Sequence, residues 1–199
     1  MHTRIVTFTG AAEIDAGVRY LKEQVAPMLR QQTGFRGVTA SADRSGGVLG
    51  ILSLWDTEAD REASESTLVK AREEGQQVIG GGFTVEHFEE MLVETAQPPA
   101  VGCSLLIRRF SMDPAKIEEN LGFFRRDVLP RITAGAGFCA VRNMINRHTG
   151  EGIVGTIWAD SAAADAAAAV GEARREQAAQ RGVRFGEQSK REIVFIDVR

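Results

Sequence analysis

The sequence has few residues of the types that build disulfide scaffolds or cross membranes. It contains two cysteines, Cys103 and Cys139, in 199 residues, which is too few for a disulfide framework. It has no run of about 18 apolar residues that could span a bilayer. Its first residues, Met1 to Arg4, lack the basic segment and apolar stretch of a secretory signal. We therefore expect a reduced, cytoplasmic protein that does not bind a membrane.

A strong excess of positive charge is also absent. The chain has 24 Lys and Arg against 27 Asp and Glu, a formal net charge of −3 at pH 7. Non-specific electrostatic binding of nucleic acid needs a net basic surface, so we expect no nucleic-acid partner. The hydrophobic fraction of 43% is that of a folded globular protein. The length suits one domain of about 200 residues or two of about 100.

What the sequence does contain is a repeat at a fixed spacing of 103 residues. Val25–Arg30 recurs as Val128–Thr133, and Trp55 recurs as Trp158, the only other tryptophan. The same offset pairs the apolar stripe of a helix in the two halves, namely Ile14, Val18, Leu21, Val25 and Leu29 with Ile117, Leu121, Phe124, Val128 and Ile132. So many matches in one register, without a gap, predict a tandem duplication of a unit of about 100 residues.

A short proline segment separates the two copies. Gln97-Pro98-Pro99-Ala100 cannot continue a helix and is stiffened by two proline rings. We therefore place the first ferredoxin-like repeat at residues 1–97 and the second at residues 101–199.

Each repeat is expected to have the element order β-α-β-β-α-β. Apolar and β-branched runs predict the strands, and apolar residues spaced by three or four predict an amphipathic first helix. Pro27 and Pro130 lie near the ends of these first helices and should kink or tighten the last turn. First strand, second helix and last strand are expected at residues 4–9, 57–74 and 84–94, and again at residues 103–110, 161–181 and 192–198.

The strands of the second repeat are apolar on both faces. Ile153–Trp158 and Ile193–Ile196 show no polar face. An antiparallel sheet covered on one side only should alternate apolar with polar residues, so both faces need cover. We predict an α+β fold in which two tandem ferredoxin-like units, with helices on one face, pack their antiparallel sheets face to face as a barrel within one chain. A monomer is sufficient for that barrel, and a homodimer through the outer helices is compatible with it.

These features resemble the dimeric α/β barrel superfamily, and locally its antibiotic biosynthesis monooxygenase branch. The resemblance rests on Pro27 before Gly34-Phe35-Arg36-Gly37, on Pro130 before Gly137-Phe138, and on the strand that runs into Trp55-Asp56-Thr57-Glu58-Ala59. The resemblance covers nearly the whole chain, but the motifs that carry it are mostly structural. It implies a small-molecule ligand and a monooxygenase that oxidises an aromatic or polyketide-like substrate without metal or other cofactor. Because fold does not fix function, a non-catalytic ligand-binding or stress-responsive barrel protein is the alternative.

The two tryptophans are the first candidate substrate-binding residues. Trp55 follows Ser53 on the same strand face, and Trp158 follows Thr156. A tryptophan beside a hydroxyl group can line a cavity and donate its indole N–H to a ligand. The alternative is that each tryptophan packs in the core or caps the barrel.

Three further residues are candidates for substrate binding. Arg142 and Asn143 interrupt an apolar strand where the first repeat has Thr39 and Ala40, which suggests a pocket kept only in the second repeat. The alternative is an edge strand that shows polar groups to water. His87 can carry a proton near neutral pH, but it has no neighbouring His or Cys to complete a metal site, and the alternative is a structural or solvent-exposed role.

The resemblance also bears on haem. Haem-degrading members of the superfamily use a histidine of the second helix as the iron ligand. The corresponding helices here, residues 58–74 and 161–181, contain no histidine. This departure argues against haem, and the sequence alone identifies no catalytic residue.

Overall fold

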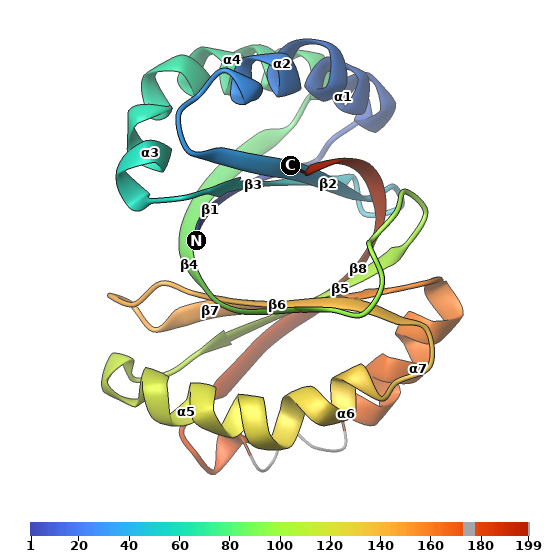
Figure 1. The fold of residues 1–199 in the computed structure, drawn as a ribbon. Coiled ribbons are helices and arrows are strands. Elements are labelled where there is room, and N and C mark those ends of the chain that lie inside the picture. Colours follow the sequence, from blue (N-terminus) through green and yellow to red (C-terminus); the bar gives the residue numbers. More distant parts are fainter. Residues whose placement is uncertain (173–177, 199) are drawn as a thin grey trace. The chain divides into compact units, whose positions relative to one another are not determined.

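The elements of the chain follow the expected order twice (Figure 1). The computed structural model describes residues 1–172 and 178–198. The first repeat comprises β1 (His2–Thr9), α1 (Ile14–Tyr20), the π-helical turn η1 (Leu21–Val25), α2 (Ala26–Arg30), β2 (Phe35–Asp43), β3 (Val48–Trp55), α3 (Glu58–Ala63), α4 (Glu65–Ile79) and β4 (Gly82–Thr95). The second comprises β5 (Ser104–Ser111), the 3-10 turn η2 (Pro114–Lys116), α5 (Ile117–Phe123), the π-helical turn η3 (Phe124–Val128), α6 (Leu129–Thr133), β6 (Phe138–Ile145), β7 (Glu151–Trp158), α7 (Ser161–Glu172) and β8 (Arg184–Val198). Of the helix expected at residues 161–181, residues 173–177 lie outside the described residues.

The strands hydrogen-bond in the order β1-β3-β2-β8-β5-β7-β6-β4, which closes on itself as a barrel. Pairing is antiparallel between β1 and β3, β2 and β3, β2 and β8, β4 and β6, β5 and β7, and β6 and β7. Each repeat keeps the ferredoxin-like neighbours, with its third strand between its first and its second. This strand order confirms the predicted α+β fold of a dimeric α/β barrel, built here by one chain.

Contacts divide the chain into two compact units whose boundaries fall within β4 and β8. Unit 1 is residues 1–87 with the chain from residue 192 onward, and unit 2 is residues 88–191. The boundaries fall there because β4 and β8, the last strand of each repeat, are long. Residues 89–95 of β4 pair with β6 in unit 2, and residues 192–198 of β8 pair with β2 in unit 1. The repeats defined by sequence therefore exchange the ends of their last strands.

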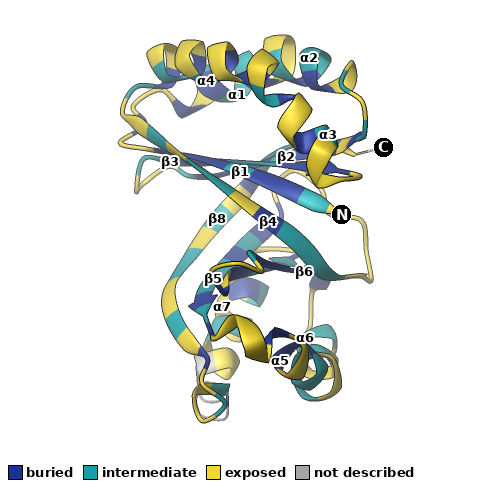
Figure 2. Cartoon of the chain, turned by 90° about the vertical axis from the view of Figure 1, so that its left-hand side faces the viewer, coloured by how far each residue is buried: buried dark blue, intermediate teal, exposed yellow. Residues whose placement is uncertain are grey.

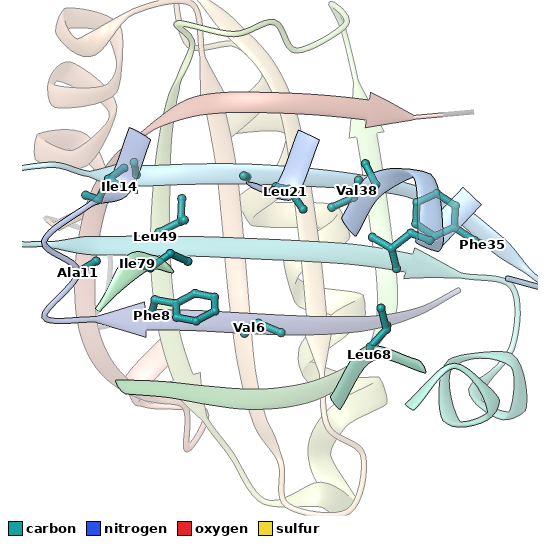
Figure 3. Packing of buried hydrophobic residues seen from close by; sticks show 14 of the residues in the cluster. Val6, Phe8, Ala11, Ile14, Leu21, Phe35, Val38, Leu49, Leu68 and Ile79 are labelled. Atoms are coloured by element: carbon teal, nitrogen blue, oxygen red, sulfur yellow. The ribbon is translucent and has the colours of Figure 1, made fainter. Parts of the chain in front are cut away.

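In unit 1 the helices cover one face of the strands, and the core lies between the two layers. Exposed residues lie on the outer side of these helices and buried residues on the side toward the strands (Figure 2). Val6 and Phe8 of β1 and Leu49 of β3 belong to one buried cluster with Leu21 and Ile79 from the helices (Figure 3). The alternation of β1 and β3 and the helical spacing of three and four residues put these apolar side chains on facing surfaces.

Both first helices contain a π-helical turn just before a proline. η1 ends at Val25, two residues before Pro27, and η3 ends at Val128, two residues before Pro130. Proline has no N–H to donate, and its ring collides with the carbonyl four residues earlier, so α-helical bonding cannot continue through it. The expected kink or tightened turn is therefore a local widening of the helix, at the same place in both repeats.

In unit 2 the buried apolar residues form two smaller clusters. One contains Leu106, Phe138, Val141, Trp158 and Ala164, and the other contains Phe110, Met112, Ile117, Ile145 and Val183. Both cysteines are buried free thiols in this unit. The two units thus share their element order but not the distribution of their core.

Candidate functional site

Unit 1 contains a cavity of about 50 Å³ between its strands and its helices. Alternate residues of β1 and β3 form one wall, and one face each of α1–η1 and α4 forms the other. Most of the lining is apolar: Val6, Phe8, Leu21, Val25, Leu29, Ile51, Leu68, Ala71 and Ile79, of which Figure 3 labels Val6, Phe8, Leu21, Leu68 and Ile79. Side chains with polar atoms enter the lining at four positions, Arg4, Tyr20, Ser53 and Arg72. An apolar cavity with a few polar groups is the usual form of a small-molecule site.

Arg4 forms a polar end of the cavity, and only 2% of it is exposed. Its Nη1 donates to Ser64 Oγ at 3.0 Å, and its Nη2 donates to the carbonyl of Arg61 and lies 2.9 Å from Glu65 Oε2. Its Nε is buried and has no hydrogen-bond partner among the described residues. A buried donor without a partner is costly, and the fold leaves this N–H unsatisfied.

Two further arginines surround this end of the cavity. Arg72 pairs with Glu65, and the buried Arg61 pairs with Glu58 at 2.9 Å. Burial lowers the pKa of Arg4 to about 10, Glu65 opposes the shift, and the positive charges of Arg72 and Arg61 add to it. Arg4 therefore remains charged at neutral pH, and it shares the Glu65 carboxylate with Arg72.

Trp55 lies beside Arg4 rather than in the lining. It is fully buried, and its Nε1 donates to Ser53 Oγ at 3.0 Å. The Arg4 guanidinium carbon lies 5.5 Å from the centre of the Trp55 ring, and Phe35 packs edge-on at 5.5 Å. The indole N–H thus already has a protein acceptor, and Trp55 contacts two lining residues, Arg4 and Ser53, without lining the cavity itself.

His87 lies on β4 near the same polar end. Phe83 and Val85 of β4 pack against the unit 1 core, and strand alternation puts His87 on the same face. His87 is exposed, yet partial burial lowers its pKa, and the positive charges of Arg61 and Arg4 lower it further. Its imidazole is therefore neutral at pH 7 and can accept a proton.

In unit 2, Trp158 and Asn143 lie on one face of the sheet. Trp158 Nε1 donates to Thr156 Oγ1 at 2.9 Å, and the Phe138 ring lies 5.7 Å away, as in unit 1. Asn143 is paired opposite Val154, which places it on the face of Thr156 and Trp158. Its Oδ1 is buried and has no partner in the described part of the chain.

Arg142 does not share a face of the sheet with Asn143 and Trp158, because adjacent strand residues point to opposite faces. It forms an ion pair with Glu90 of β4, and burial lowers its pKa. The alternative that this strand is a water-exposed edge is wrong, since β6 pairs with β7 on one side and with β4 on the other. Of the five predicted binding residues, Trp55 and His87 thus lie near the unit 1 cavity, while Trp158 and Asn143 share a face in unit 2.

Sequence reasoning missed Arg4, Arg61 and Arg72. A signal for Arg4 exists in the sequence: it is the only Lys, Arg, Asp or Glu of β1, and it shares a strand face with Val6 and Phe8. The pairing registers place Arg4 opposite Ser53 and Leu106 opposite Thr156. The same position is therefore charged in one repeat and apolar in the other.

Metal-binding clusters and membrane-spanning helices are both absent from the described residues. Within residues 1–172 and 178–198, no group of three or more His, Cys, Asp or Glu side chains could hold a metal ion. None of the described helices is long and apolar enough to cross a membrane.

Comparison with known sequences finds relatives that are themselves uncharacterised. No protein-family model matches the chain. Rv2557, an uncharacterised protein of Mycobacterium tuberculosis strain H37Rv, is 24% identical over 154 residues, which covers 77% of this chain and 69% of that protein. Rv2558 of the same strain is 26% identical over 133 residues, covering 67% of this chain and 56% of that protein.

Comparison with solved structures identifies the fold. A "putative monooxygenase" from Fusobacterium nucleatum superposes with a TM-score of 0.72 at 9% identity, covering 100% of this chain and 94% of that one. An anthrone oxidase-like protein has a TM-score of 0.66 at 16% identity, with coverages of 99% and 92%. A ferredoxin-fold protein related to antibiotic biosynthesis monooxygenases, from Listeria monocytogenes, has a TM-score of 0.53 at 10% identity, with coverages of 97% and 95%. The chain therefore has the dimeric α/β barrel fold found in proteins related to antibiotic biosynthesis monooxygenases.

Proposed function

We propose that the chain binds a small, largely apolar molecule in the cavity of unit 1 and oxidises it as a cofactor-independent monooxygenase. The observation that carries the proposal is the cavity, whose apolar walls end at Arg4, Ser53 and Arg72. The fold shared with proteins that carry the monooxygenase name supports oxidation. The likeness to an anthrone oxidase-like protein supports an aromatic or polyketide-like substrate.

Such a reaction needs no cofactor when the substrate itself forms a stabilised carbanion. A CH₂ group activated by aromatic rings loses a proton, and molecular oxygen accepts the electrons. The CH₂ group becomes a carbonyl, one oxygen atom enters the product, and the other leaves as water with the two substrate hydrogens. The protein has to hold the substrate, exclude water and stabilise the negative charge. In this proposal Arg4 stabilises that charge, and the proton leaves the cavity for the neutral His87, which lies outside the lining.

The size of the cavity sets a condition on an aromatic substrate. An apolar cavity of about 150 Å³ binds benzene, whereas the unit 1 cavity has about 50 Å³. Side chains of the lining therefore have to move when an aromatic ring enters. The π-helical turn η1 supplies Leu21 and Val25 to the lining, and π-helical turns are frequent at functional sites.

A second candidate function is ligand binding without catalysis. The ionisable side chains of the lining are Arg4, Tyr20 and Arg72, and none of them is a carboxylate or an imidazole. Burial and a 2.8 Å hydrogen bond to Glu74 raise the pKa of Tyr20 to about 12, so its hydroxyl stays protonated. His87, an imidazole base near this end, lies outside the lining. This lining favours binding even if no reaction follows.

Anthrone is a suitable probe because its CH₂ group lies between two aromatic rings. We expect the protein to convert anthrone to anthraquinone faster than the spontaneous reaction, with one O₂ consumed for each product. Ala71→Phe, which fills the cavity from α4, should abolish conversion. Val69→Phe, on the exposed side of the same helix, is the matched control and should leave it unchanged.

Three outcomes separate the candidate functions. Equal activity of Ala71→Phe and the unmodified chain would remove the cavity from the mechanism. Binding of anthrone without conversion would leave the non-catalytic candidate. Neither binding nor conversion would contradict both for this substrate class, and native mass spectrometry of the purified protein then tests directly for a retained ligand of another class.

A further inference from the structure

We infer that the cavity of unit 1 is a site for an organic acid, whose carboxylate or other acidic oxygen binds the guanidinium of Arg4 while its apolar part lies along the cavity. The inference rests on the proposed function, because it names the chemical class of molecule that this cavity takes. It does not depend on whether the bound molecule is then oxidised.

The first observation is an unpaired donor on a buried residue that lines an apolar cavity. Arg4 lines the cavity, its two terminal nitrogens are bonded to Ser64, the Arg61 carbonyl and Glu65, and its buried Nε has no partner among the described residues. The buried Nε of Arg61 is likewise without a partner there. An oxygen atom that accepts from Arg4 Nε would satisfy a donor that the fold leaves unpaired.

The second observation is the charge at this end of the cavity. Arg4 and Arg72 both line it, and both are paired with the same carboxylate, Glu65. Glu65 is partly exposed, so water screens its charge, whereas Arg4 is almost completely buried. Burying a charge in apolar surroundings is costly unless it is neutralised. A ligand anion would supply that neutralisation, and a neutral amide or alcohol would not.

The third observation is that packing does not require an arginine here. In the second repeat, Leu106 occupies the position that Arg4 has in the first. It lies opposite Thr156, near the corresponding tryptophan and phenylalanine, Trp158 and Phe138. Leu106 packs there in an ordinary apolar cluster. A buried arginine where leucine suffices costs stability, so its presence calls for a role in binding.

The experiment compares acids with amides of the same shape. Butanoate and butanamide form a slender pair, and benzoate and benzamide form an aromatic pair. In a Trp158→Phe background the fluorescence comes from Trp55 alone, whose ring lies 5.5 Å from the Arg4 guanidinium. The Arg4 Nε–H resonance in a ¹⁵N NMR spectrum reports directly whether an oxygen binds that group.

We expect at least one acid to shift the Arg4 Nε–H resonance and to bind about tenfold or more tightly than its amide, as a charge-assisted hydrogen bond allows. Arg4→Leu should abolish that preference. Arg36→Leu, which removes an exposed arginine of the same unit paired with Asp56, should retain it. Thermal unfolding of Arg4→Leu confirms that the variant is folded.

Equal binding of acid and amide, or a preference that survives Arg4→Leu, would overturn the inference. If the amides or anthrone bind and Ala71→Phe abolishes their binding, the cavity remains a site while the acid subsite is refuted. If no acid binds at millimolar concentration, the acid subsite is refuted whatever the anthrone assay shows. The failure of this inference is thus distinct from failure of the proposed function.

Discussion

Arg4 is the residue on which the chemistry of unit 1 depends most. Replacing one partner of a buried ion pair is usually destabilising, because the other charge is left buried and unpaired. Glu65 is different, since it is partly exposed and keeps its pairing with Arg72. We therefore expect Arg4→Leu to change the free energy of unfolding by less than about 2 kcal/mol, toward greater stability.

Chemical denaturation of Arg4→Leu and the unmodified chain measures this change. A loss of clearly more than 2 kcal/mol would show that the arginine holds Ser64 and the Arg61 carbonyl in place for structural reasons. Retained stability with lost acid binding would show that the residue serves the ligand at some cost to the fold.

His87 gives the proposed oxidation a defined pH dependence. A base must be unprotonated to accept a proton, and the His87 pKa lies below its usual 6.5 because of partial burial and the charges of Arg61, Arg4 and Arg72, with Glu65 opposing them. The rate of anthrone oxidation should therefore rise with pH, with a midpoint below 6.5, and be constant above neutral pH. His87→Gln should lose this pH dependence together with most of the rate. A midpoint above 7, or an unchanged profile in His87→Gln, would assign the base to another group.

At the residue scale, the sequence predicts which side chains contact each other better than it predicts what those side chains do. It places Ser53 and Trp55 on one strand face, and they are hydrogen-bonded in the structure. It does not show that this bond occupies the indole N–H. Nor does it bring Arg4, Arg61 and Arg72 together, because they come from three elements whose contact depends on how the helices pack.

At the element scale, the two second helices begin with corresponding caps. Thr57 Oγ1 accepts from the Asp60 N–H at 3.1 Å, and Asp160 Oδ1 accepts from the Ala163 N–H at 2.8 Å. We expect Thr57→Ala and Asp160→Ala each to lower the free energy of unfolding by about 1 kcal/mol, since each leaves a helix N–H without its acceptor. Thr57→Ser and Asp160→Asn keep an acceptor and should lose little. Unfolding curves for the four variants test this, and equal losses within either pair would contradict the capping role.

Gly75 of α4 offers a test of the cavity through stability. A Cβ atom there would lie 3.5 Å from Phe8 Cζ and 3.7 Å from Tyr20 Cε1, which is ordinary contact. Gly75→Ala should raise the free energy of unfolding by about 1 kcal/mol through helix propensity, and somewhat more through the buried methyl group, while it weakens binding in the smaller cavity. Gly171→Ala in α7 is the control, because a Cβ there meets nothing within 4 Å. Thermal unfolding and probe titration measure both effects, and a destabilised Gly75→Ala would mean that the helix cannot take the added methyl group.

Elements were predictable where periodicity is strong. The apolar stripe from Ile14 to Leu29 predicts the first helix, and Pro27 marks the irregular point in it. The form of that irregularity is not in the pattern, because a proline is compatible with a kink, a tightened turn or a wider one. The sequence predicts last strands that are shorter than β4 and β8, since their pairing with strands of the other repeat cannot be read from local alternation.

At the scale of the whole molecule, duplication explains both the fold and its asymmetry. The register at 103 residues and the strands apolar on both faces predict a single-chain barrel, which the strand order confirms. Repeats that keep one fold can diverge in chemistry. The Trp–hydroxyl pair is present in both, whereas the buried arginine with its cavity belongs to unit 1. The sequence suggests a pocket in the second repeat from Arg142 and Asn143, and we propose the first instead.

The most direct test of this account is a methyl ¹H–¹³C NMR spectrum of the protein titrated with butanoate. Binding in unit 1 predicts shifts of the Leu68 and Ile51 methyl groups, which line the cavity, while those of Leu106 and Val154 in unit 2 remain in place. Shifts confined to Leu106 and Val154, or no shifts at saturating probe, would contradict the assignment of the acid-binding cavity to unit 1.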